Sequence, residues 1–461
     1  MTTLDNPVAA PVLPAPVPPQ RHLTFFEFVR ALRQSAIDSF AQEAYEQDIV
    51  QRRIFGRSLF VVNDPAAIKH VLIDNAANYQ KTEITRRILE PGLGKGLITS
   101  EGETWRQHRR IMSPSFDHRS TAAYVPVMTG AAVELSTQWE QTPAGTAIDA
   151  STAMMQVTLN IISRTMFSND SDDIVTIMSR SAGRYQAEMR PNIMDMLGWP
   201  KWLAGLPRRR VAERTLGEFD HVIDRLIEER VRDPEAYPKD LLARLVAARD
   251  EQTGVGMSAQ EVRDHVITIF LAGHETTAMA MTWTWFLLSQ HPDVETKLHA
   301  ELGAVLGGRA PAHEDLSALT YTRMVIEESM RIYPPVHTIA RQALDADILV
   351  GRHIPKGSTV MIAPWLLHRH VKLWDNPSVF DPERFSPERS AGRVRFSYMP
   401  FGGGKRICIG AAFSLAEATI LLATLAQRFS LRLAPGHRVE PQGLITLRAR
   451  YGMKMLLSRR S

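Results

Sequence analysis

The chain has 461 residues, of which 44% are hydrophobic and 23% charged, and its formal net charge is +4 at pH 7. A chain of this length can bury a large core and still hold a cofactor. Its one cysteine excludes intramolecular disulfides, and it also excludes zinc or iron–sulfur sites that need several thiolates. Basic residues form no run long enough for a nucleic-acid arm, so we interpret the positive balance as a docking face for an acidic partner.

The N-terminal segment, residues 1–22, is apolar but contains six prolines. Proline removes amide donors and breaks helices, so this segment is neither a signal-peptide core nor a membrane anchor, and we predict a flexible tail. No polar linker divides residues 23–461, so we expect one large domain there. We also expect the protein to be a cytoplasmic monomer.

The elements that follow the tail begin with a predicted hairpin over residues 52–64, where glycine interrupts β-branched and aromatic residues. Asp64 then caps a helix whose first residue is Pro65. Helical periodicity continues to about residue 333, and strand patterns return at 347–365 and 443–457. We therefore expect a mainly α fold with a smaller β region.

The longest apolar run extends from Val266 to Leu288 and could span a bilayer. His274 and Glu275 lie near its middle, and ionisable groups at that depth are costly, so a buried helix fits better. Its stretch "AGHETT" places Thr276 four residues after an alanine, where the hydroxyl can bond back to the helix carbonyl. His274 and Thr276 could be ordinary paired core residues, but an unpaired Glu275 would be expensive in an apolar helix.

The only cysteine, Cys408, lies in "FGGGKRICIG", directly before an amphipathic helix. The glycines at 402–404 permit positive φ values and let the backbone approach a flat object closely. Because a helix N-terminus favours an anion, we expect a lowered thiol pKa and a thiolate that could be a nucleophile or a metal ligand. The alternative is an inert core cysteine, which is the commoner state of an isolated residue.

The residues around this cysteine form the pattern F-x-x-G-x-R-x-C-x-G from Phe401 to Gly410. This pattern closely resembles the haem-binding loop of the cytochrome P450 family. The resemblance implies that Cys408 is the axial thiolate ligand of the iron of haem b, that Arg406 pairs with a haem propionate, and that Phe401 packs beside the sulfur.

A second resemblance concerns ion pairing. The family's E-x-x-R motif matches Glu328 and Arg331, and Arg384 matches the arginine that completes the family's buried structural triad. Spacing alone would also allow a surface ion pair worth less than about 1 kcal/mol. The apolar residues around Glu328 and Arg331 favour burial.

A third resemblance concerns the haem propionates. Trp105 and Arg109 match the family's W-x-x-x-R, and Arg341 occupies a place where the family often supplies another propionate partner. The alternative is a helix with a solvated basic side, which we prefer for Arg106 and Arg110. Together these matches extend from about residue 40 onward and imply the P450 fold, with haem between the central long helix and the cysteine-loop helix.

The resemblance further implies monooxygenation of an apolar small molecule, such as a fatty acid or a terpenoid, by O₂. Glu275 and Thr276 match the family's catalytic acid–alcohol pair, which delivers protons. Electrons would come from NAD(P)H through a reductase and a separate ferredoxin or flavodoxin-type donor. We expect that donor to dock on the cysteine side, where Lys405, Arg106 and Arg110 supply positive charge.

Two other functions remain open from the sequence. A peroxide-driven haem peroxygenase would share the fold but would typically lack the acid–alcohol pair, and a non-catalytic haem sensor or carrier would have no need of it. By the same resemblance, the substrate pocket would be lined by residues 82–97, 192–207, 266–272, 336–339 and 444–446. These segments do not identify the substrate.

Overall fold

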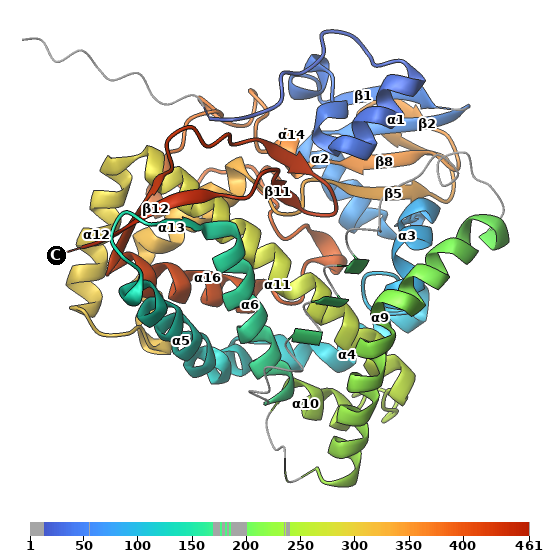
Figure 1. Ribbon diagram of the computed structural model, residues 1–461. Helices are drawn as coiled ribbons and strands as arrows, with labels where there is room; N and C mark the ends of the chain where they lie inside the picture. Colours follow the sequence, from blue (N-terminus) through green and yellow to red (C-terminus); the bar gives the residue numbers. More distant parts are fainter. Residues whose placement is uncertain are drawn as a thin grey trace, which may run out of the picture.

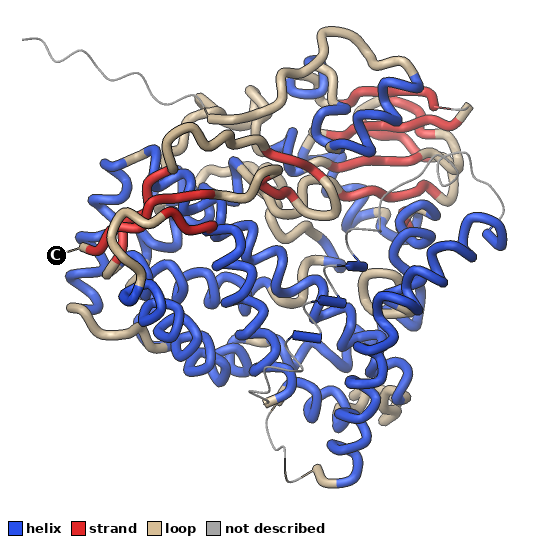
Figure 2. The backbone as a smooth tube through the Cα atoms, in the orientation of Figure 1, coloured by secondary structure: helices blue, strands red, loops and turns tan. Residues whose placement is uncertain are grey.

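The structure is a computed structural model that describes residues 13–54, 56–168, 176–177, 180–181, 184–185, 201–234, 236 and 240–460, with residues 201–209 described in backbone only. Helices make up most of the molecule, and a sheet lies at one side of it (Figures 1 and 2). The mainly α fold with a smaller β region is therefore confirmed. Among the described residues, no helix is both long and apolar enough to cross a membrane.

The helical body is built around α11, Ala259–Gln290, which runs through the middle of the molecule (Figure 1). A capping box starts this helix, because Ser258 accepts a hydrogen bond from the Glu261 amide and Glu261 accepts one from the Ser258 amide. The expectation of a buried central helix is confirmed. The other long helices are α5 (His118–Gln141), α6 (Ala150–Phe167), α9 (Lys201–Arg232), α12 (Pro292–Leu306), α13 (Thr320–Ile332) and α16 (Ala411–Ala426).

The shorter helices connect these elements. They are α1 (Phe25–Gln34), α2 (Pro65–Lys69), α3 (Glu83–Leu93), α4 (Gly102–Met112), α10 (Leu241–Ala247), α14 (Pro364–Leu367) and α15 (Pro387–Ser390). Tighter or wider single turns occur at η1 (Ala36–Ser39), η2 (Gln42–Tyr45), η3 (His70–Asp74), η4 (Ala76–Asn78), η5 (Ser113–Phe116), η6 (His313–Ser317), η7 (Pro382–Phe385) and η8 (Gly404–Arg406). As predicted, Asp64 caps α2 by accepting a hydrogen bond from the Ala67 amide, and Pro65 is its first residue.

The main sheet has the strand order β1-β2-β8-β5-β3. Its strands are β1 (Ile49–Ile54), β2 (Arg57–Val62), β3 (Tyr79–Lys81), β5 (Ile339–Ala343) and β8 (Thr359–Ile362). The predicted hairpin is the antiparallel pair β1–β2, and β2 pairs in parallel with β8 from the far end of the chain. In Figure 1 the blue N-terminal strands and the orange later strands accordingly lie side by side. The sheet thus joins segments 300 residues apart.

Three smaller sheets complete the β region of the described residues. One has the order β4-β12-β9, and the other two are the hairpins β6–β7 and β10–β11. Their strands are β4 (Ala147–Asp149), β6 (Asp347–Leu349), β7 (Arg352–Ile354), β9 (Phe429–Leu433), β10 (Pro441–Gly443), β11 (Leu447–Ala449) and β12 (Lys454–Arg459). The strand patterns at 347–365 and 443–457 therefore correspond to real strands.

The N-terminal segment contacts the body of the molecule from Leu13 onward, where Leu13 packs against the main core. The carbonyl of Pro14 accepts a hydrogen bond from the Tyr333 hydroxyl at 2.9 Å, and that of Pro19 accepts one from the Gln42 amide at 3.0 Å. Proline lacks an amide donor but keeps its carbonyl acceptor, so a proline-rich segment can still be held in place. Of the flexible tail predicted for residues 1–22, residues 1–12 lie outside the described residues.

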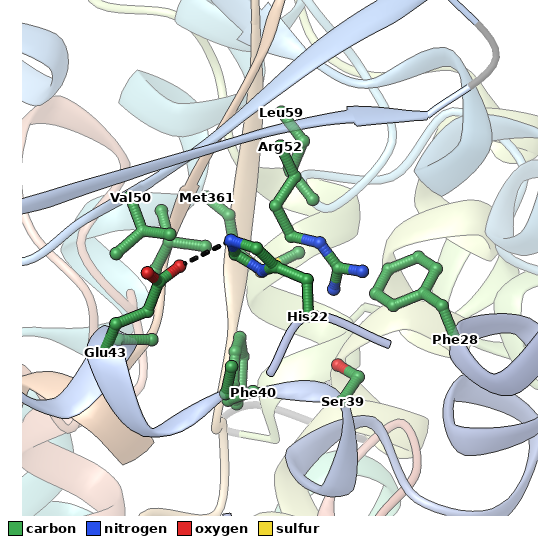
Figure 3. Close-up of a pocket in the computed structure, with 12 residues that line it drawn as sticks. His22, Phe28, Ser39, Phe40, Glu43, Val50, Arg52, Leu59 and Met361 are labelled. Atoms are coloured by element: carbon green, nitrogen blue, oxygen red, sulfur yellow. Dashed lines mark ion pairs between the residues drawn. The ribbon is translucent and has the colours of Figure 1, made fainter. Parts of the chain in front are cut away.

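A small cavity lies beside α1 and the β1–β2 hairpin (Figure 3). His22 and Glu43 form an ion pair of 2.7 Å at its edge, and the Arg52 guanidinium lies over the Phe28 ring at 4.7 Å. The volume is about 20 Å³, which is enough for one water molecule. This cavity is therefore too small for an organic substrate.

Candidate functional site

The cysteine loop is a tight turn that closes on itself. The Cys408 amide donates a hydrogen bond to the Phe401 carbonyl at 3.0 Å. Gly404 has φ +68°, and a Cβ there would lie 2.2 Å from the Leu72 carbonyl oxygen. Only glycine meets both conditions. The sequence interpretation assigned these glycines to close approach of a flat ligand, whereas at Gly404 the close approach is to the protein's own backbone.

The thiol of Cys408 is accessible, yet enough protein surrounds it that burial raises its pKa. A hydrogen bond from the Gly410 amide and the charge of Arg109 act in the opposite direction but are weaker. The expectation that the helix N-terminus lowers the thiol pKa is therefore wrong for the protein alone, because desolvation outweighs the local donors. A coordinated metal ion deprotonates a thiol, so thiolate formation and iron binding are expected to occur together.

One face of the central helix α11 is partly exposed. Between residues 264 and 289 only Ala272, Gly273 and Thr276 are partly exposed, and all the others are buried. These three lie on one side of the helix. The Thr276 hydroxyl donates to the Ala272 carbonyl at 2.9 Å, which confirms the predicted back-bond. The buried helix therefore presents a narrow, small-residue surface with one hydroxyl on it.

This open face adjoins the start of α16. The hydroxyls of Thr277 on α11 and Ser414 on α16 lie 3.0 Å apart. Residues 411–415, directly after the cysteine loop, are partly exposed, whereas residues 416–426 are buried. Accessible positions of both helices thus lie next to each other and next to Cys408. This is the place that the sequence predicted for the cofactor, between the central helix and the cysteine-loop helix.

A cluster of cations borders the site. The β3–β5 register places Lys81 opposite Arg341, and Arg406 pairs with Glu101. Burial and then the charge of Arg406 lower the pKa of Lys81 to about 6 and that of Arg341 to about 10. Glu101, whose carboxylate also accepts a hydrogen bond from the Lys81 amide at 2.9 Å, is the one acidic group that acts on these pKa values. Arg341 and Arg406 stay charged at pH 7, and with only one carboxylate beside them an incoming anionic group would be stabilised and would favour protonation of Lys81.

The side chains of α4 complete this cluster. The Arg406 guanidinium lies over the Trp105 ring at 4.2 Å, and Arg109 donates to the Ile407 carbonyl at 2.9 Å. The indole N–H of Trp105 finds no hydrogen-bond partner in the described part of the chain. The structure therefore brings Trp105, Arg109, Arg406 and the cysteine loop together, although Trp105 and Cys408 are about 300 residues apart in sequence.

These features fit a haem. Cys408 provides an accessible sulfur, and the partly exposed residues of α11 are small. The cations and the free indole N–H suit the two carboxylates that haem carries. The groups that would hold those carboxylates are Lys81, Trp105, Arg109, Arg341 and Arg406. Sequence reasoning missed Lys81 and Glu101, because no local pattern marks either residue.

Glu275 is held by the β10–β11 hairpin. Its carboxylate accepts hydrogen bonds of 2.5 Å from the Thr446 hydroxyl and from Arg448 Nε. Glu275 is 1% exposed, whereas the Arg448 side chain is 33% exposed. The cost of a carboxylate in an apolar helix is thus offset by an ion pair whose other member reaches the surface.

Glu417 on α16 is a buried acid that sequence reasoning missed. Burial raises its pKa to about 8, and a hydrogen bond with Thr277 opposes that rise. At neutral pH the carboxyl is therefore mostly protonated. Its sequence signal was a single glutamate inside the apolar run of the helix after Cys408.

This protonated acid predicts a pH dependence of stability. Between about pH 4.5 and 8 the folded state keeps the Glu417 proton that the unfolded state releases. Its contribution to the free energy of unfolding should therefore fall by about 1.4 kcal/mol per pH unit as pH rises. Urea denaturation at several pH values should show that Glu417→Gln removes this slope and is more stable than wild type at pH 8. The exposed Glu388→Gln is the control, and an unchanged slope in Glu417→Gln would refute the assignment.

The predicted structural triad is assembled. Arg331 donates to both carboxylate oxygens of Glu328 at 2.6 and 2.7 Å, and both side chains are 0% exposed. Arg384 Nε lies 3.4 Å from the Glu328 carboxylate. The alternative of a surface ion pair is therefore excluded. The Asp381 amide, in the same segment as Arg384, donates a hydrogen bond to the Glu328 carboxylate at 3.0 Å.

Of the expected pocket-lining segments, residues 192–200 lie outside the described residues. Within the described hairpin tip, Ile445 is 44% exposed. His337 Nε2 donates a 2.8 Å hydrogen bond to the Leu444 carbonyl, which fixes this tip to the segment at 336–339. Two of the predicted lining segments are thus in contact.

Comparison with known proteins gives consistent results. The family model described as Cytochrome P450 matches residues 15–449. The chain is 37% identical to cyclooctatin synthase of Streptomyces melanosporofaciens over 87% of both chains. It is 33% identical to cyclooctat-9-en-7-ol 5-monooxygenase of the same organism, over 84% of this chain and 83% of the relative. A putative cytochrome P450 132 of Mycobacterium tuberculosis is 34% identical over 92% of this chain and 93% of the relative.

Solved structures agree with this result. The crystal structure of the cytochrome P450DA heme domain superposes with a TM-score of 0.85 at 26% sequence identity. The match covers 97% of this chain and 99% of that heme domain. The similarity therefore extends over the whole helical body and the sheets, not only over the cysteine loop.

Proposed function

The chain belongs to the cytochrome P450 family and is a cytochrome P450 monooxygenase, and from this premise we propose that it hydroxylates an apolar, terpenoid-like small molecule. The reaction is R–H + O₂ + 2e⁻ + 2H⁺ giving R–OH + H₂O. The observation that carries the proposal is the accessible Cys408 beside the open face of α11, where a hydroxyl lies on an otherwise apolar surface. The names of two relatives, cyclooctatin synthase and cyclooctat-9-en-7-ol 5-monooxygenase, favour a cyclic, largely hydrocarbon substrate.

The side chains have distinct roles in this proposal. Haem b, when bound, supplies oxygen activation and oxidation of the C–H bond. Cys408 would hold its iron, while the cation cluster would hold its carboxylates. Phe401, which packs partly buried against the main core, would shield the sulfur from water.

Thr276 and Glu275 would supply the protons for the reaction. The Thr276 hydroxyl is the polar group on the open face and would hold a proton at the oxygen-binding position. Glu275 would pass protons to it, and Arg448 and Thr446 keep the Glu275 carboxylate on the side of the β10–β11 hairpin. Since Arg448 is partly exposed, we infer that protons enter from that side.

Thr276→Ala tests this role. We expect product formed per NAD(P)H consumed to fall roughly tenfold to a hundredfold, because the hydroxyl that directs proton transfer is removed. Haem content should stay unchanged. Thr282→Ala is a matched control, since Thr282 makes the same back-bond, to Ala278 at 2.7 Å, at a fully buried position of α11. Wild-type coupling in Thr276→Ala would contradict the proposed relay.

A family member of this type receives its electrons from a redox partner, and we propose a ferredoxin or flavodoxin-type donor with its reductase. Of the three cations expected to attract this donor, two form ion pairs within the protein. Arg106 pairs with Glu103 at 2.8 Å, and Arg110 pairs with Asp250 at 2.9 Å. Lys405 in the cysteine loop is exposed and has no ion-pair partner in the described part of the chain. Lys405 is therefore the better candidate for attracting an acidic donor.

Lys405→Gln should slow reduction of the protein by such a donor roughly threefold to tenfold at low salt. The difference should disappear at about 1 M salt, where charges farther apart than about 3 Å are screened. Stopped-flow reduction measures both rates. Lys356→Gln, in the turn between β7 and β8, is the control. Equal rates for Lys405→Gln and wild type at low salt would exclude docking through this residue.

The substrate class is tested by a binding screen. Cyclic terpene alcohols, fatty acids and aromatic hydrocarbons are titrated into the haem protein, and the shift of the haem absorption band is recorded. We expect the terpene alcohols to give the tightest binding. Turnover is then measured with surrogate redox partners and with peroxide, and product formed only with peroxide would favour the peroxygenase. We further propose that the protein acts as a cytoplasmic monomer, which sedimentation and cell fractionation test.

A further inference from the structure

Two buried histidines connect α4 to α11. His265 Nε2 lies 2.9 Å from His108 Nδ1, and His108 Nε2 lies 3.2 Å from a carboxylate oxygen of Glu261. The two rings meet edge to face with centroids 4.7 Å apart. His265 is 0% exposed and His108 is 2% exposed, whereas the Glu261 side chain is 38% exposed. A carboxylate–imidazole–imidazole chain thus runs from the surface into the interior.

The chemistry of its three members fixes the direction of this chain. The Glu261 carboxylate only accepts hydrogen bonds, so His108 Nε2 carries a proton and donates it. Burial, and then the neighbouring His108, lower the pKa of His265 to about 3, so His265 is neutral at pH 7. With the proton of His108 on Nε2, Nδ1 of the same ring is an acceptor, so His265 Nε2 donates to it. Glu261 is itself held by the Ser258 amide at 2.8 Å.

The inner end of the chain is an acceptor. His265 Nδ1 is buried and has no hydrogen-bond partner in the described part of the chain, and the same is true of Thr268 Oγ1, three residues further along α11. Buried polar atoms are nearly always paired, with water where protein does not suffice. The two orphaned atoms on adjacent turns therefore suit one internal water molecule.

The outer part of this hydrogen-bond chain includes a residue of α4, the helix that also carries residues proposed to bind the haem carboxylates. His108 lies on α4 between Trp105 and Arg109, the two α4 residues that the cation cluster includes. Besides this chain, α4 is tied by Arg110 to Asp250 and by Arg109 to the Ile407 carbonyl. Of these contacts, the two that His108 makes, with His265 and with Glu261, link α4 directly to α11.

We propose that His108 is a positioning residue, which holds α4 against α11 through its opposite donor and acceptor sides so that Trp105 and Arg109 meet the haem carboxylates. This role of His108 rests on the proposed function, in which Trp105 and Arg109 contact the haem carboxylates. Loss of His108 would leave an acceptor and a donor, on Glu261 and His265, without their partner. The orientation of α4 then becomes less defined, and so do the donors for the haem carboxylates.

The test compares side chains that keep or lose this polarity. His108→Gln retains an outer N–H donor and an inner carbonyl acceptor, whereas His108→Phe retains only ring volume. Haem transfer to excess apomyoglobin is expected to be about tenfold faster for His108→Phe, with a shifted haem reduction potential. His108→Gln should stay within roughly twofold of wild type in both measurements. His313→Phe, at an exposed position on η6, is the matched control.

Either of two results would overturn the proposal: wild-type haem transfer and potential in His108→Phe, or equal behaviour of His108→Gln and His108→Phe. A measurement on the unmodified holoprotein covers the case in which a variant fails to fold. Nitrogen NMR of histidine at pH 7 should show that His108 and His265 each carry a proton on Nε2, and a proton on His108 Nδ1 would refute the chain.

The underlying haem contacts are tested separately. Trp105→Phe and Arg109→Gln should each speed haem transfer if these residues hold the carboxylates. If neither does, the proposed contacts fail, and with them the functional role of His108. The NMR tautomers would still report whether the hydrogen-bond chain exists.

Discussion

Replacing Cys408 with histidine is expected to abolish the thiolate-type absorption band of the reduced, carbon-monoxide-treated haem protein. An imidazole can bind iron but does not supply the negative charge of a thiolate. Monooxygenase turnover should fall by more than about a hundredfold, because the electron donation that favours O–O cleavage is lost. Absorption spectra of purified protein with measured haem content provide the readout.

The neighbouring residue supplies the control for this change. Ile407 is 43% exposed in the same loop, so Ile407→Val disturbs the loop locally without altering the ligand. That variant should keep the thiolate band. Survival of the band in Cys408→His would mean that another residue binds the iron, and the assignment of the site would then be wrong. The raised thiol pKa of the protein alone also predicts that Cys408 becomes a thiolate only when haem is present.

The site could be located from sequence where its residues lie in local motifs. Cys408 and Arg406 share one loop, Trp105 and Arg109 share one helix, and the apolar period of α11 indicated burial. Such patterns depend on neighbours within a few residues, so they survive without knowledge of the fold. The long helices were predictable for the same reason.

The remaining parts of the site depend on contacts that no local pattern records. Lys81 reaches the site because β3 pairs with β5, which places it opposite Arg341 some 260 residues later. β3 has three residues, too few to show an alternating pattern. The partner of Glu275 likewise comes from a hairpin near the C-terminus. Tertiary pairing, not propensity, determined these positions.

The directions of the pKa shifts were the least predictable feature of the site. The helix N-terminus after Cys408 led to an expectation of a lowered thiol pKa, but burial dominates and raises it. For Glu417 no local pattern indicated a neutral acid, because its pKa depends on how completely α16 is covered. Desolvation is a property of the whole packed structure, so it cannot be computed from neighbours in sequence.

The second large effect is expected at the structural triad. Glu328→Gln removes the negative charge that compensates Arg331, and both side chains are 0% exposed. Leaving one charge of a buried pair uncompensated costs about 3–5 kcal/mol, which is a large part of the stability of an ordinary domain. We expect a strong loss of haem-containing protein and a much lower denaturation midpoint. Glu327→Gln on the same helix, whose partner Arg323 is 59% exposed, should change stability by less than about 1 kcal/mol.

The double variant Glu328→Leu with Arg331→Met separates two roles of the triad. If charge compensation were its only role, removing both charges together should restore much of the stability. However, Arg331 also donates to the carbonyls of His368, Pro377 and Val379, at 2.8, 2.8 and 3.0 Å. Its loss leaves these acceptors without their donor, at a cost of about 1–3 kcal/mol for the buried His368 carbonyl and less for the two part-buried carbonyls. We therefore expect no recovery in the double variant when urea midpoints are compared. Recovery to near wild type would mean that the ion pair only neutralises charge and that the arginine does not hold the segment at 368–379 in place.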